Sequence, residues 1–460
     1  MASSPEPDCS DSSTESSSSD AQSESSSIVY GHESFDQFQD KVLAFARSCT
    51  WLPSNDENEI SVERLHGGTY NRVIGLTFTS SQRKDQDLTR SPPTEGRALE
   101  TVSKYILRIP RSDAARVDDD VAALLFVKRL PDLDPCPEMP EIPVPEVIAF
   151  DDTKNNRLGS CFMVQNRLRG QRLDEVYPQL GHEKQRRVAQ DLGRVYRRML
   201  SVSSTQAGTL VLPDDNKSLD LEIHVTPWDT SVWNFLMGER EPRKSAPYRS
   251  GRSGESVLEL LRRTFQEQKA EVRKRLSDAL RPRHFDQFCE MVSAMDAAGF
   301  FKELDGHFTL SHLDLEPRNI LVDPESPPDR RIISGILDWD SAVLAPAFMS
   351  CAPPMWIWAW QEDENEDERL ANEEPATPEQ KELKTLFETA AGPQYIRCAY
   401  HPAYRLGRRL VRFAIDGIRS NEDVKEGEAM VREWQSLLPQ PAVKATADND
   451  KREHTVSRDI

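Results

Sequence analysis

The chain is poor in cysteine and glycine for its 460 residues, and it lacks an excess of positive charge. Its 20 glycines follow no repeating period, which excludes a collagen-like chain. The 58 Lys and Arg residues are outnumbered by 77 Asp and Glu residues, so the formal net charge is −19. Because such a chain repels phosphates, we do not expect nucleic acid or an anionic membrane as its main partner.

Seven cysteines are scattered along the sequence, and no two of them form a C-x-x-C pair. This spacing argues against a disulfide framework and a zinc site, and it indicates free thiols in a reducing compartment. The N-terminus has no basic segment followed by an apolar one, so we expect no secretory leader and a cytoplasmic protein.

The stretch 341–360 carries no charge, but it contains three prolines. Prolines would break the helix that a bilayer requires, so we expect a buried, irregular segment and no membrane span.

The length suggests more than one globular unit, and composition and hydrophobic pattern divide the chain into four parts. Residues 1–27 hold 13 Ser and six acids and no Lys or Arg, so we expect a disordered tail. We expect a β-rich lobe over 35–168, a mostly helical lobe over 169–440, and a polar tail over 441–460. The fold class is therefore α+β.

Hydrophobic periodicity predicts the elements of both lobes. The strands are expected at 60–65, 73–78, 104–109, 147–150, 160–168, 320–322 and 332–337, with a loop over 80–100. The helices are expected at 117–130, 188–199, 257–280 and 400–438.

The densest group of chemically active residues is S-H-L-D-L-E-P-R-N-I-L-V at 311–322. An Asp followed five residues later by an Asn, on a loop that enters an apolar strand, suits phosphoryl transfer to a hydroxyl. Asp314 would accept the proton of the attacking hydroxyl, and Asn319 would bind a metal ion that bridges the phosphates. Asp338, in G-I-L-D-W-D, would meet Asn319 across a hairpin and complete a Mg²⁺ site.

A lone H-x-D followed by Asn also occurs in ordinary turns, which Asp and Asn favour. The paired occurrence of both motifs around two apolar strands favours the functional interpretation for Asp314, Asn319 and Asp338. We expect His312 to brace the loop rather than to act as an acid or base.

These motifs resemble the catalytic region of the aminoglycoside phosphotransferase and choline kinase-like superfamily, whose usual pattern is H-G-D-x-x-x-x-N followed by I-D-W-E. Leu313 stands here in place of the Gly, and Asp340 in place of the Glu. The similarity runs roughly from Val62 to Ala342, and the Pro- and Trp-rich stretch that follows is typical of the large fungal branch.

The resemblance implies a bilobal, protein-kinase-like fold with a small β-rich N-lobe and a larger, mainly helical C-lobe. It also implies transfer of the γ-phosphate of ATP, with Mg²⁺ as cofactor, to a hydroxyl of a small molecule. Protein kinases carry a Lys two residues after the catalytic Asp, where this chain has Glu316 and then Arg318 two residues further on. This difference favours a small acceptor over a protein.

The resemblance assigns further residues to the nucleotide. Gly67, Gly68 and Asn71 match the loop that covers the phosphates, although a G-G pair in a hairpin is usually only a turn. The backbone of Gln165, Asn166 and Arg167 matches the hinge that faces adenine.

Arg108 falls where the family commonly has a Lys on the phosphates, and strand alternation puts it on one face with Ile106. A surface Arg whose stem lies on the sheet is the alternative. Asp120 is the best match for the acid that holds this cation, with Asp118 and Asp119 as close competitors.

Two functions stay open at this stage. The first is the active small-molecule phosphotransferase. The second is a catalytically weak, kinase-like protein that senses nucleotide or serves as a scaffold, which the departures at Leu313, Arg108 and Asp120 keep open.

The acceptor has two interpretations as well. Trp356, Trp358 and Trp360, followed by the acidic run 362–368, would suit a cationic acceptor if the segment is extended. The more usual roles are tryptophans packed in the core and a solvated acidic loop.

Overall fold

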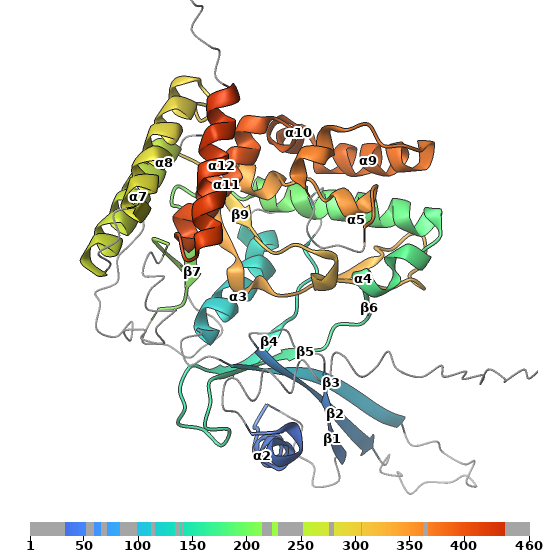
Figure 1. Cartoon of the computed structure of the whole chain (residues 1–460). Coiled ribbons are helices and arrows are strands. Elements are labelled where there is room, and N and C mark those ends of the chain that lie inside the picture. Colours follow the sequence, from blue (N-terminus) through green and yellow to red (C-terminus); the bar gives the residue numbers. More distant parts are fainter. Residues whose placement is uncertain are drawn as a thin grey trace, which may run out of the picture.

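The structure is a computed structural model that describes residues 33–51, 59–65, 71–82, 99–111, 116–133, 139, 141–213, 223–228, 252–275, 280–304, 306–361 and 367–437 (Figure 1). The expected tails at 1–27 and 441–460 lie outside these residues.

The N-terminal region is built on an antiparallel five-stranded sheet in the order β1-β2-β3-β5-β4. The strands are β1 (Glu59–Arg64), β2 (Asn71–Gln82), β3 (Leu99–Pro110), β4 (Val147–Asp151) and β5 (Phe162–Asn166). Helix α2 (Phe35–Arg47) covers one face, because Phe38, Val42 and Phe45 repeat at helical spacing and are buried. Helix α3 (Val117–Leu133) lies between the sheet and the helical region (Figure 1).

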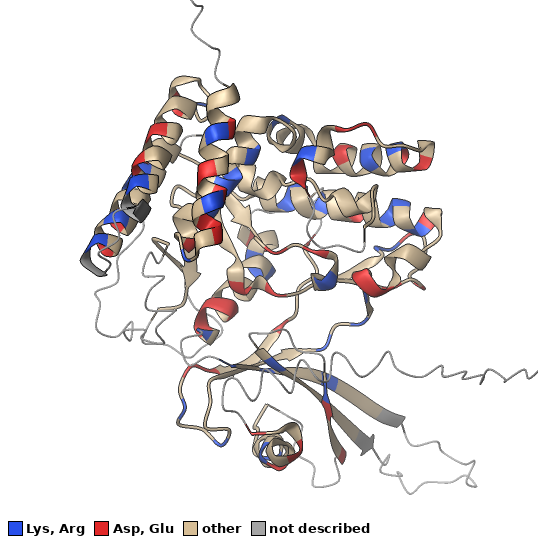
Figure 2. Ribbon diagram, in the orientation of Figure 1, with Lys and Arg blue, Asp and Glu red and all other residues tan. Residues whose placement is uncertain are grey.

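The C-terminal region consists mainly of helices that enclose one large hydrophobic core (Figure 1). The helices are α4 (Leu173–Val176), α5 (His182–Ser201), α7 (Val257–Arg275), α8 (Leu280–Ala297), α9 (Pro378–Ala391), α10 (Pro393–Ala399), α11 (Pro402–Asp416) and α12 (Asn421–Leu437). Acidic and basic residues are both distributed along these helices (Figure 2). The expected α+β class, with a β-sheet region followed by a helical region, is confirmed.

Two small antiparallel sheets complete the structure, and the site loops connect their strands. One has the order β11-β10-β6, and the other has the order β8-β7-β12-β9. Their strands are β6 (Gln171–Arg172), β7 (Gly208–Val211), β8 (His224–Thr226), β9 (Phe308–Ser311), β10 (Ile320–Val322), β11 (Ile333–Ile336) and β12 (Val343–Pro346). The expected hairpin is present as β10 and β11, in which Ile320 pairs with Ile336.

Some expected boundaries are wrong. The sequence predicts a loop over 80–100, whereas β2 continues to Gln82 and β3 begins at Leu99. The polar ends pair in register, with Ser80 opposite Thr101 and Ser81 opposite Glu100, so strand pairing outweighs the polarity of this stretch.

The two longest expected helices are each interrupted. The helix predicted over 257–280 ends at Arg275, and α8 begins at Leu280 with Pro282 in its first turn, where proline is tolerated. The helix predicted over 400–438 is split by Gly417, whose φ of 73° lies in the left-handed region that ends helices. Helix α9 was not predicted, although Thr377 and Gln380 form the capping box that marks its start.

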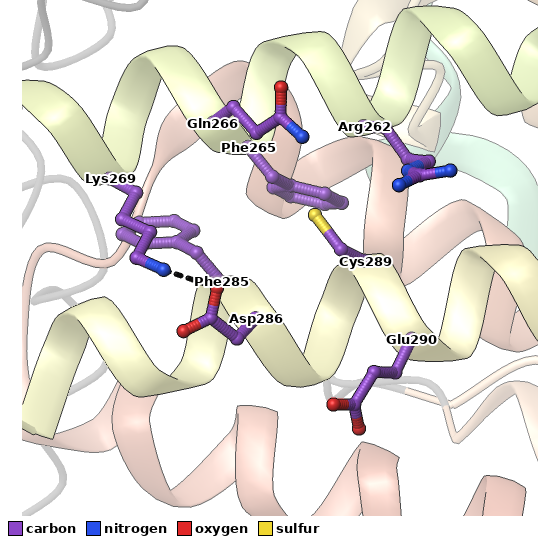
Figure 3. A pocket seen from close by; sticks show the side chains of 8 residues that line it. All are labelled: Arg262, Phe265, Gln266, Lys269, Phe285, Asp286, Cys289 and Glu290. Carbon is purple, nitrogen blue, oxygen red and sulfur yellow. Dashed lines mark hydrogen bonds and ion pairs between the residues drawn. The ribbon is translucent and has the colours of Figure 1, made fainter.

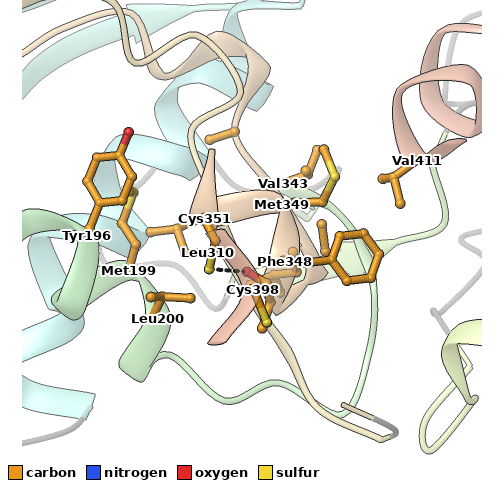
Figure 4. Packing of buried hydrophobic residues seen from close by; sticks show 14 of the residues in the cluster. Tyr196, Met199, Leu200, Leu310, Val343, Phe348, Met349, Cys351, Cys398 and Val411 are labelled. Carbon is orange, nitrogen blue, oxygen red and sulfur yellow. Dashed lines mark hydrogen bonds between the residues drawn. The ribbon is translucent and has the colours of Figure 1, made fainter. Parts of the chain in front are cut away.

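The stretch 341–360 is buried, as expected, but it begins with strand β12 and continues through two 3₁₀ helices, Ala347–Cys351 and Met355–Ile357. Phe348, Cys351 and Cys398 pack there among aliphatic side chains of the core (Figure 4). Within the described ranges, all the cysteines are free thiols, and no helix is both long and apolar enough to cross a bilayer.

A buried arginine joins three parts of this core. Arg408 in α11 is 5% exposed and donates hydrogen bonds to the carbonyl oxygens of Phe348, Cys398 and Ala399 at 3.2, 3.0 and 3.0 Å. Its guanidinium also forms an ion pair with Glu368. Removal of this side chain would leave buried acceptors and a carboxylate without their donor.

We therefore expect Arg408→Met to destabilise the protein by about 3–5 kcal/mol, the range for a buried charge that loses its partner. The adjacent Arg409 is a matched control, because its pair with Glu426 at 3.0 Å is exposed, and Arg409→Met should cost at most about 1 kcal/mol. Urea unfolding of both variants measures the difference. Equal midpoints would contradict the role of Arg408.

Candidate active site

The loop between β9 and β10 holds the carboxylate of Asp314 by both oxygens. Arg318 Nη2 donates to Asp314 Oδ1 at 2.6 Å, and Asn319 Nδ2 donates to Asp314 Oδ2 at 2.8 Å. The same amide nitrogen donates to the main-chain oxygen of Asp314 at 2.9 Å. A 3₁₀ turn, Pro317–Asn319, brings these side chains back to Asp314, so the spacing of five residues closes a compact loop.

The β10–β11 hairpin brings Asn319 beside Asp338. The amide of Leu337 donates to the carbonyl oxygen of Asn319 at 2.8 Å, and Asp338 is the next residue. The amide nitrogen of the Asn319 side chain is used by Asp314, which leaves its Oδ1 as the atom suited to a cation.

Arg108 reaches this turn from strand β3. Its Nη2 donates to Asp338 Oδ1 at 2.7 Å and lies 3.8 Å from carboxylate oxygens of both Asp120 and Asp340. Arg108 is only 9% exposed, so it does not lie on the surface, as the alternative interpretation would require. Of the three acids at the start of α3, Asp120 makes the ion pair with Arg108.

One guanidinium faces three carboxylates in this cluster, and the pKa values reflect the imbalance. Burial raises the pKa of Asp120 well above its usual value; the charge of Arg108 opposes this rise, and the neighbouring carboxylates of Asp340 and Asp338 add to it. Burial and the charge of Asp338 raise the pKa of Asp340 to about 6. Burial alone would lower the pKa of Arg108, but Asp120, Asp338 and Asp340 reverse the effect and raise it.

The charge balance fits a divalent cation. Three carboxyl groups face one guanidinium, so the cluster has more acidic groups than cations, and Asn319 and Asp338 present the oxygen atoms that Mg²⁺ prefers. Within the described part of the chain, no three His, Cys, Asp or Glu side chains are placed to hold a metal ion by themselves. A Mg²⁺ ion at such a site would take its other ligands from water and phosphate, as it usually does.

His312 braces the loop through both ring nitrogens. Its Nε2 lies 2.9 Å from the carbonyl oxygen of Leu337, and its Nδ1 accepts from the amide of Asp314 at 3.3 Å. A carbonyl only accepts, so Nε2 carries the proton and the ring is neutral. Burial lowers the pKa of His312, which agrees with the neutral form. Trp339 packs edge-on against this ring, with the two ring centroids 4.5 Å apart.

Two residues of the site adopt left-handed backbone conformations. Leu313 and Asp338 have φ values of 65° and 64° and are the non-glycine residues with positive φ in the described ranges. Asp tolerates this region, whereas Leu is costly there, and Leu313 occupies the position that is Gly in the usual motif. Arg412 in α11 donates to the carbonyl oxygen of Leu313 at 2.7 Å and helps to hold the turn.

Only some of the residues predicted to bind nucleotide lie within the described part of the chain. Gly67 and Gly68 lie outside the described residues, and Asn71 is the first residue of β2, opposite Pro110. The amides of Asn166 and Arg167 donate to the carbonyl oxygens of Glu146 and Lys104, both at 3.0 Å. These backbone donors are already used within the sheet region, so a purine there would need other partners.

Gln165 offers such a partner through its side chain. It pairs with Ile106 across β3 and β5, so its side chain lies on the same sheet face as Arg108. It is 6% exposed, and its Oε1 has no hydrogen-bond partner among the described residues. A buried acceptor of this kind suits a ligand that carries N–H groups.

The tryptophans that suggested a cationic acceptor belong to the core. Trp356 and Trp358 are each 4% exposed, and Met355–Ile357 is helical rather than extended. The face of Trp358 is contacted by the protein's own Lys384, whose Nζ lies 5.4 Å from the ring centroid. The packing interpretation therefore holds for these two residues, and the cation cage loses its geometry.

A pocket of about 450 Å³ lies between α7 and α8 and is lined by Phe265, Phe285 and Cys289 (Figure 3). Lys269 and Asp286 form an ion pair across its rim. None of the site residues predicted from the sequence lines it, so it is separate from the cluster around Asp314.

A β-sheet region, a helical region and the two motifs that the β10–β11 hairpin brings together define a kinase-like phosphotransferase. The model of the phosphotransferase enzyme family (APH) matches residues 95–382, more than half of the chain, so the chain belongs to this family. No curated protein matches the chain. The fungal branch stays a prediction.

Several solved structures are similar at low identity. The GDP complex of wild-type aminoglycoside 2′-phosphotransferase-IIIa is 15% identical, with a TM-score of 0.40, and covers 86% of this chain and 98% of its own. A mutant of aminoglycoside phosphotransferase APH(4)-Ia with AMP-PNP and hygromycin B is 14% identical, with a TM-score of 0.41 and coverages of 82% and 93%. A putative aminoglycoside phosphotransferase from Ralstonia eutropha is 13% identical, with a TM-score of 0.40 and coverages of 86% and 95%.

Sequence reasoning assigned no role to two residues that the structure adds to the site. Asp340 was noted only as a replacement for Glu, yet it lies 3.8 Å from Arg108. Arg318 was noted only for its position after Glu316, yet it bonds to Asp314. The signal available for both was their spacing from an assigned Asp. Asp340 follows Asp338 by two residues, and Arg318 follows Asp314 by four residues.

The strained turn gives a test by substitution. Leu313→Gly and Leu313→Ala both remove the half-buried side chain, but Gly adopts a φ of 65° without strain. We expect the Gly variant to be more stable than the Ala variant by about 1 kcal/mol, as the cost of left-handed backbone implies.

Leu315 is the matched control, because it is half-buried against the same core and has no positive φ. There the order should reverse, since Gly is normally less stable than Ala by about 0.5–1 kcal/mol. Urea unfolding of the four variants checks both orders. An Ala variant at position 313 that is the more stable of its pair would refute the strain.

Proposed function

We propose that this protein transfers the γ-phosphoryl group of ATP to a hydroxyl of a small molecule, with Mg²⁺ as cofactor. The observation that carries the proposal is the doubly held carboxylate of Asp314 next to the charged cluster of Arg108 and Asp338. A fixed base beside a site for phosphates and a cation is what transfer to an alcohol requires.

Asp314 would act as the base. As the acceptor oxygen bonds to the γ-phosphorus, the bond from that phosphorus to the β,γ-bridging oxygen breaks, and the hydroxyl proton passes to Asp314. Asn319 and Arg318 fix the orientation of its carboxylate. His312 is excluded as the base, because both its nitrogens are engaged and it is buried.

The remaining residues would bind the nucleotide. Asn319 and Asp338 would hold Mg²⁺, which supplies charge neutralisation for the phosphates when it is bound. Arg108 would pair with the phosphates while Asp120 anchors it, and the buried Oε1 of Gln165 would accept from a base N–H. Gly67, Gly68 and Asn71 are proposed to cover the phosphates.

A second candidate has support from one contact. Arg108 bonds to Asp338 at 2.7 Å, so the proposed metal ligand already has a cationic partner. This arrangement suits a catalytically weak, kinase-like protein that binds nucleotide as a sensor or scaffold. A screen of neutral and cationic metabolites with hydroxyl groups separates the two, because binding of Mg·ATP without transfer to any of them favours the sensor.

The role of Asp314 predicts a loss of turnover without a loss of binding. Asp314→Asn keeps an acceptor for Arg318 but removes the base, so kcat should fall by about 10²-fold or more. Calorimetry with Mg·ATP should give an affinity within about twofold of the wild type. If the variant turned over normally, the assignment of the base would be wrong.

The metal site predicts a binding defect that depends on Mg²⁺. Asp338→Asn should weaken ADP binding by about tenfold or more in Mg²⁺ and have little effect in EDTA, because it removes a charge that would face the cation. Asp323→Asn, in the turn of the same hairpin, is the control. Equal affinities for the Asp338 variant and the wild type in Mg²⁺ would place the metal elsewhere.

A further inference from the structure

We infer that Arg318 is a further catalytic residue, which contacts the transferring phosphoryl group and takes the place of the lysine that protein kinases carry near the catalytic Asp. The inference rests on the proposed function. Its starting point is the contact between Arg318 Nη2 and Asp314 Oδ1 at 2.6 Å. The residue two positions after Asp314 is Glu316, which cannot supply a positive charge.

Stability does not account for this pair. The side chains of Arg318 and Asp314 are 34% and 32% exposed, and ion pairs with that much solvent usually contribute at most about 1 kcal/mol. A contact of little structural value between a base and a guanidinium, both partly exposed to solvent, is more consistent with a role in the reaction.

The geometry leaves the phosphoryl group within reach of Arg318. An acceptor hydroxyl lies about 2.6–3.2 Å from the base that takes its proton. The phosphorus that it attacks lies about 3–3.5 Å further on. A rotation of the Arg318 side chain would therefore bring its guanidinium to the oxygens of the transferring group. The guanidinium carries five N–H donors for these oxygens.

The chemistry of a guanidinium suits this position. Its fork matches the oxygens of a phosphoryl group in pairs, and its charge does not titrate in the working range. Fixed donors aimed at charge that develops during the reaction stabilise the transition state more than the ground state. Arg108 is assigned a different task, because it would pair with the phosphates that stay on the nucleotide while Asp120 anchors it.

Arg412 also places a guanidinium beside the loop, and its contacts differ. It donates to the carbonyl oxygen of Leu313 and lies 4.0 Å from Asp416 in the same helix. It therefore holds the backbone of the turn, whereas Arg318 holds the reacting carboxylate. The inference assigns the phosphoryl contact to Arg318 alone.

A complex with a mimic of the transferring group tests this without any acceptor. We would measure the affinity of the purified full chain for ADP and Mg²⁺ by calorimetry, with and without aluminium fluoride, for the wild type, Arg318→Gln and Arg318→Lys. The control is Arg186→Gln, since that side chain is 36% exposed and pairs with Glu183 at 2.7 Å on α5. Thermal unfolding of each variant verifies that it is folded.

Aluminium fluoride should tighten ADP binding to the wild type and to the Arg186 control equally. Arg318→Gln should bind ADP within about twofold of the wild type but lose about 10²-fold of the extra affinity, the usual cost of one donor to developing charge. Arg318→Lys should regain part of it, because it keeps the charge and loses the fork.

Two results overturn the inference. One is an Arg318→Gln variant that forms the fluoride complex as tightly as the wild type, and the other is a wild type that binds Mg·ADP but gains nothing from fluoride. Failure of the proposed function has a different signature, since the wild type would then either not bind Mg·ADP at all or bind Mg·ATP and transfer phosphate to no acceptor in the metabolite screen. If Arg318→Gln were unfolded, Arg318→Lys would decide, because full retention of the fluoride effect would show that no forked contact is made.

Discussion

A single buried guanidinium connects the two regions of this phosphotransferase. Arg108 comes from the N-terminal sheet, Asp120 from the start of α3, and Asp338 and Asp340 from the turn after β11. Loss of one partner from a buried charge cluster typically costs about 3–5 kcal/mol, because the remaining charges stay desolvated. The relative position of the sheet and the β10–β11 hairpin therefore depends on this contact more than on any exposed ion pair.

The same contact constrains how a nucleotide could bind. Arg108 and a divalent cation would both be attracted to Asp338, so the protein supplies its own counter-charge when no cation is near. An arginine can rotate its fork from a carboxylate toward a phosphate while a second acid still holds it, and Asp120 is placed for that purpose. Replacement of the family's usual lysine by arginine thus has a physical consequence, namely that metal and nucleotide would be taken up together.

The sequence predicts which of these side chains lie close together better than it predicts the boundaries of the helices and strands. One hairpin fixes the spacing of Asn319 and Asp338, and Asp314 is only five residues from Asn319. Strand alternation placed Arg108 on one face with Ile106 but left a surface position open, which its burial in the structure excludes. The break at Gly417 and the polar ends of β2 and β3 depend on backbone conformation and on pairing with distant residues, which local periodicity does not record. The helical turn at Trp356 could not be predicted either, because the prolines before it permit several backbone conformations.

Leu313 could not have been predicted to adopt a left-handed conformation, and the reason bears on function. A leucine adopts a φ of 65° only where its surroundings leave no alternative. Three hydrogen bonds to main-chain carbonyl oxygens impose the turn here. They join His312 to Leu337, Arg412 to Leu313, and the Asn319 side chain to Asp314. Strain held in place by neighbours on both sides keeps the following carboxylate from sampling other orientations. Because catalysis by a base depends on orientation within a fraction of an ångström, a loop that is rigid before substrate arrives loses less entropy in the reaction. The substitution of glycine by leucine is thus compatible with an active enzyme, provided that the bracing by His312 remains.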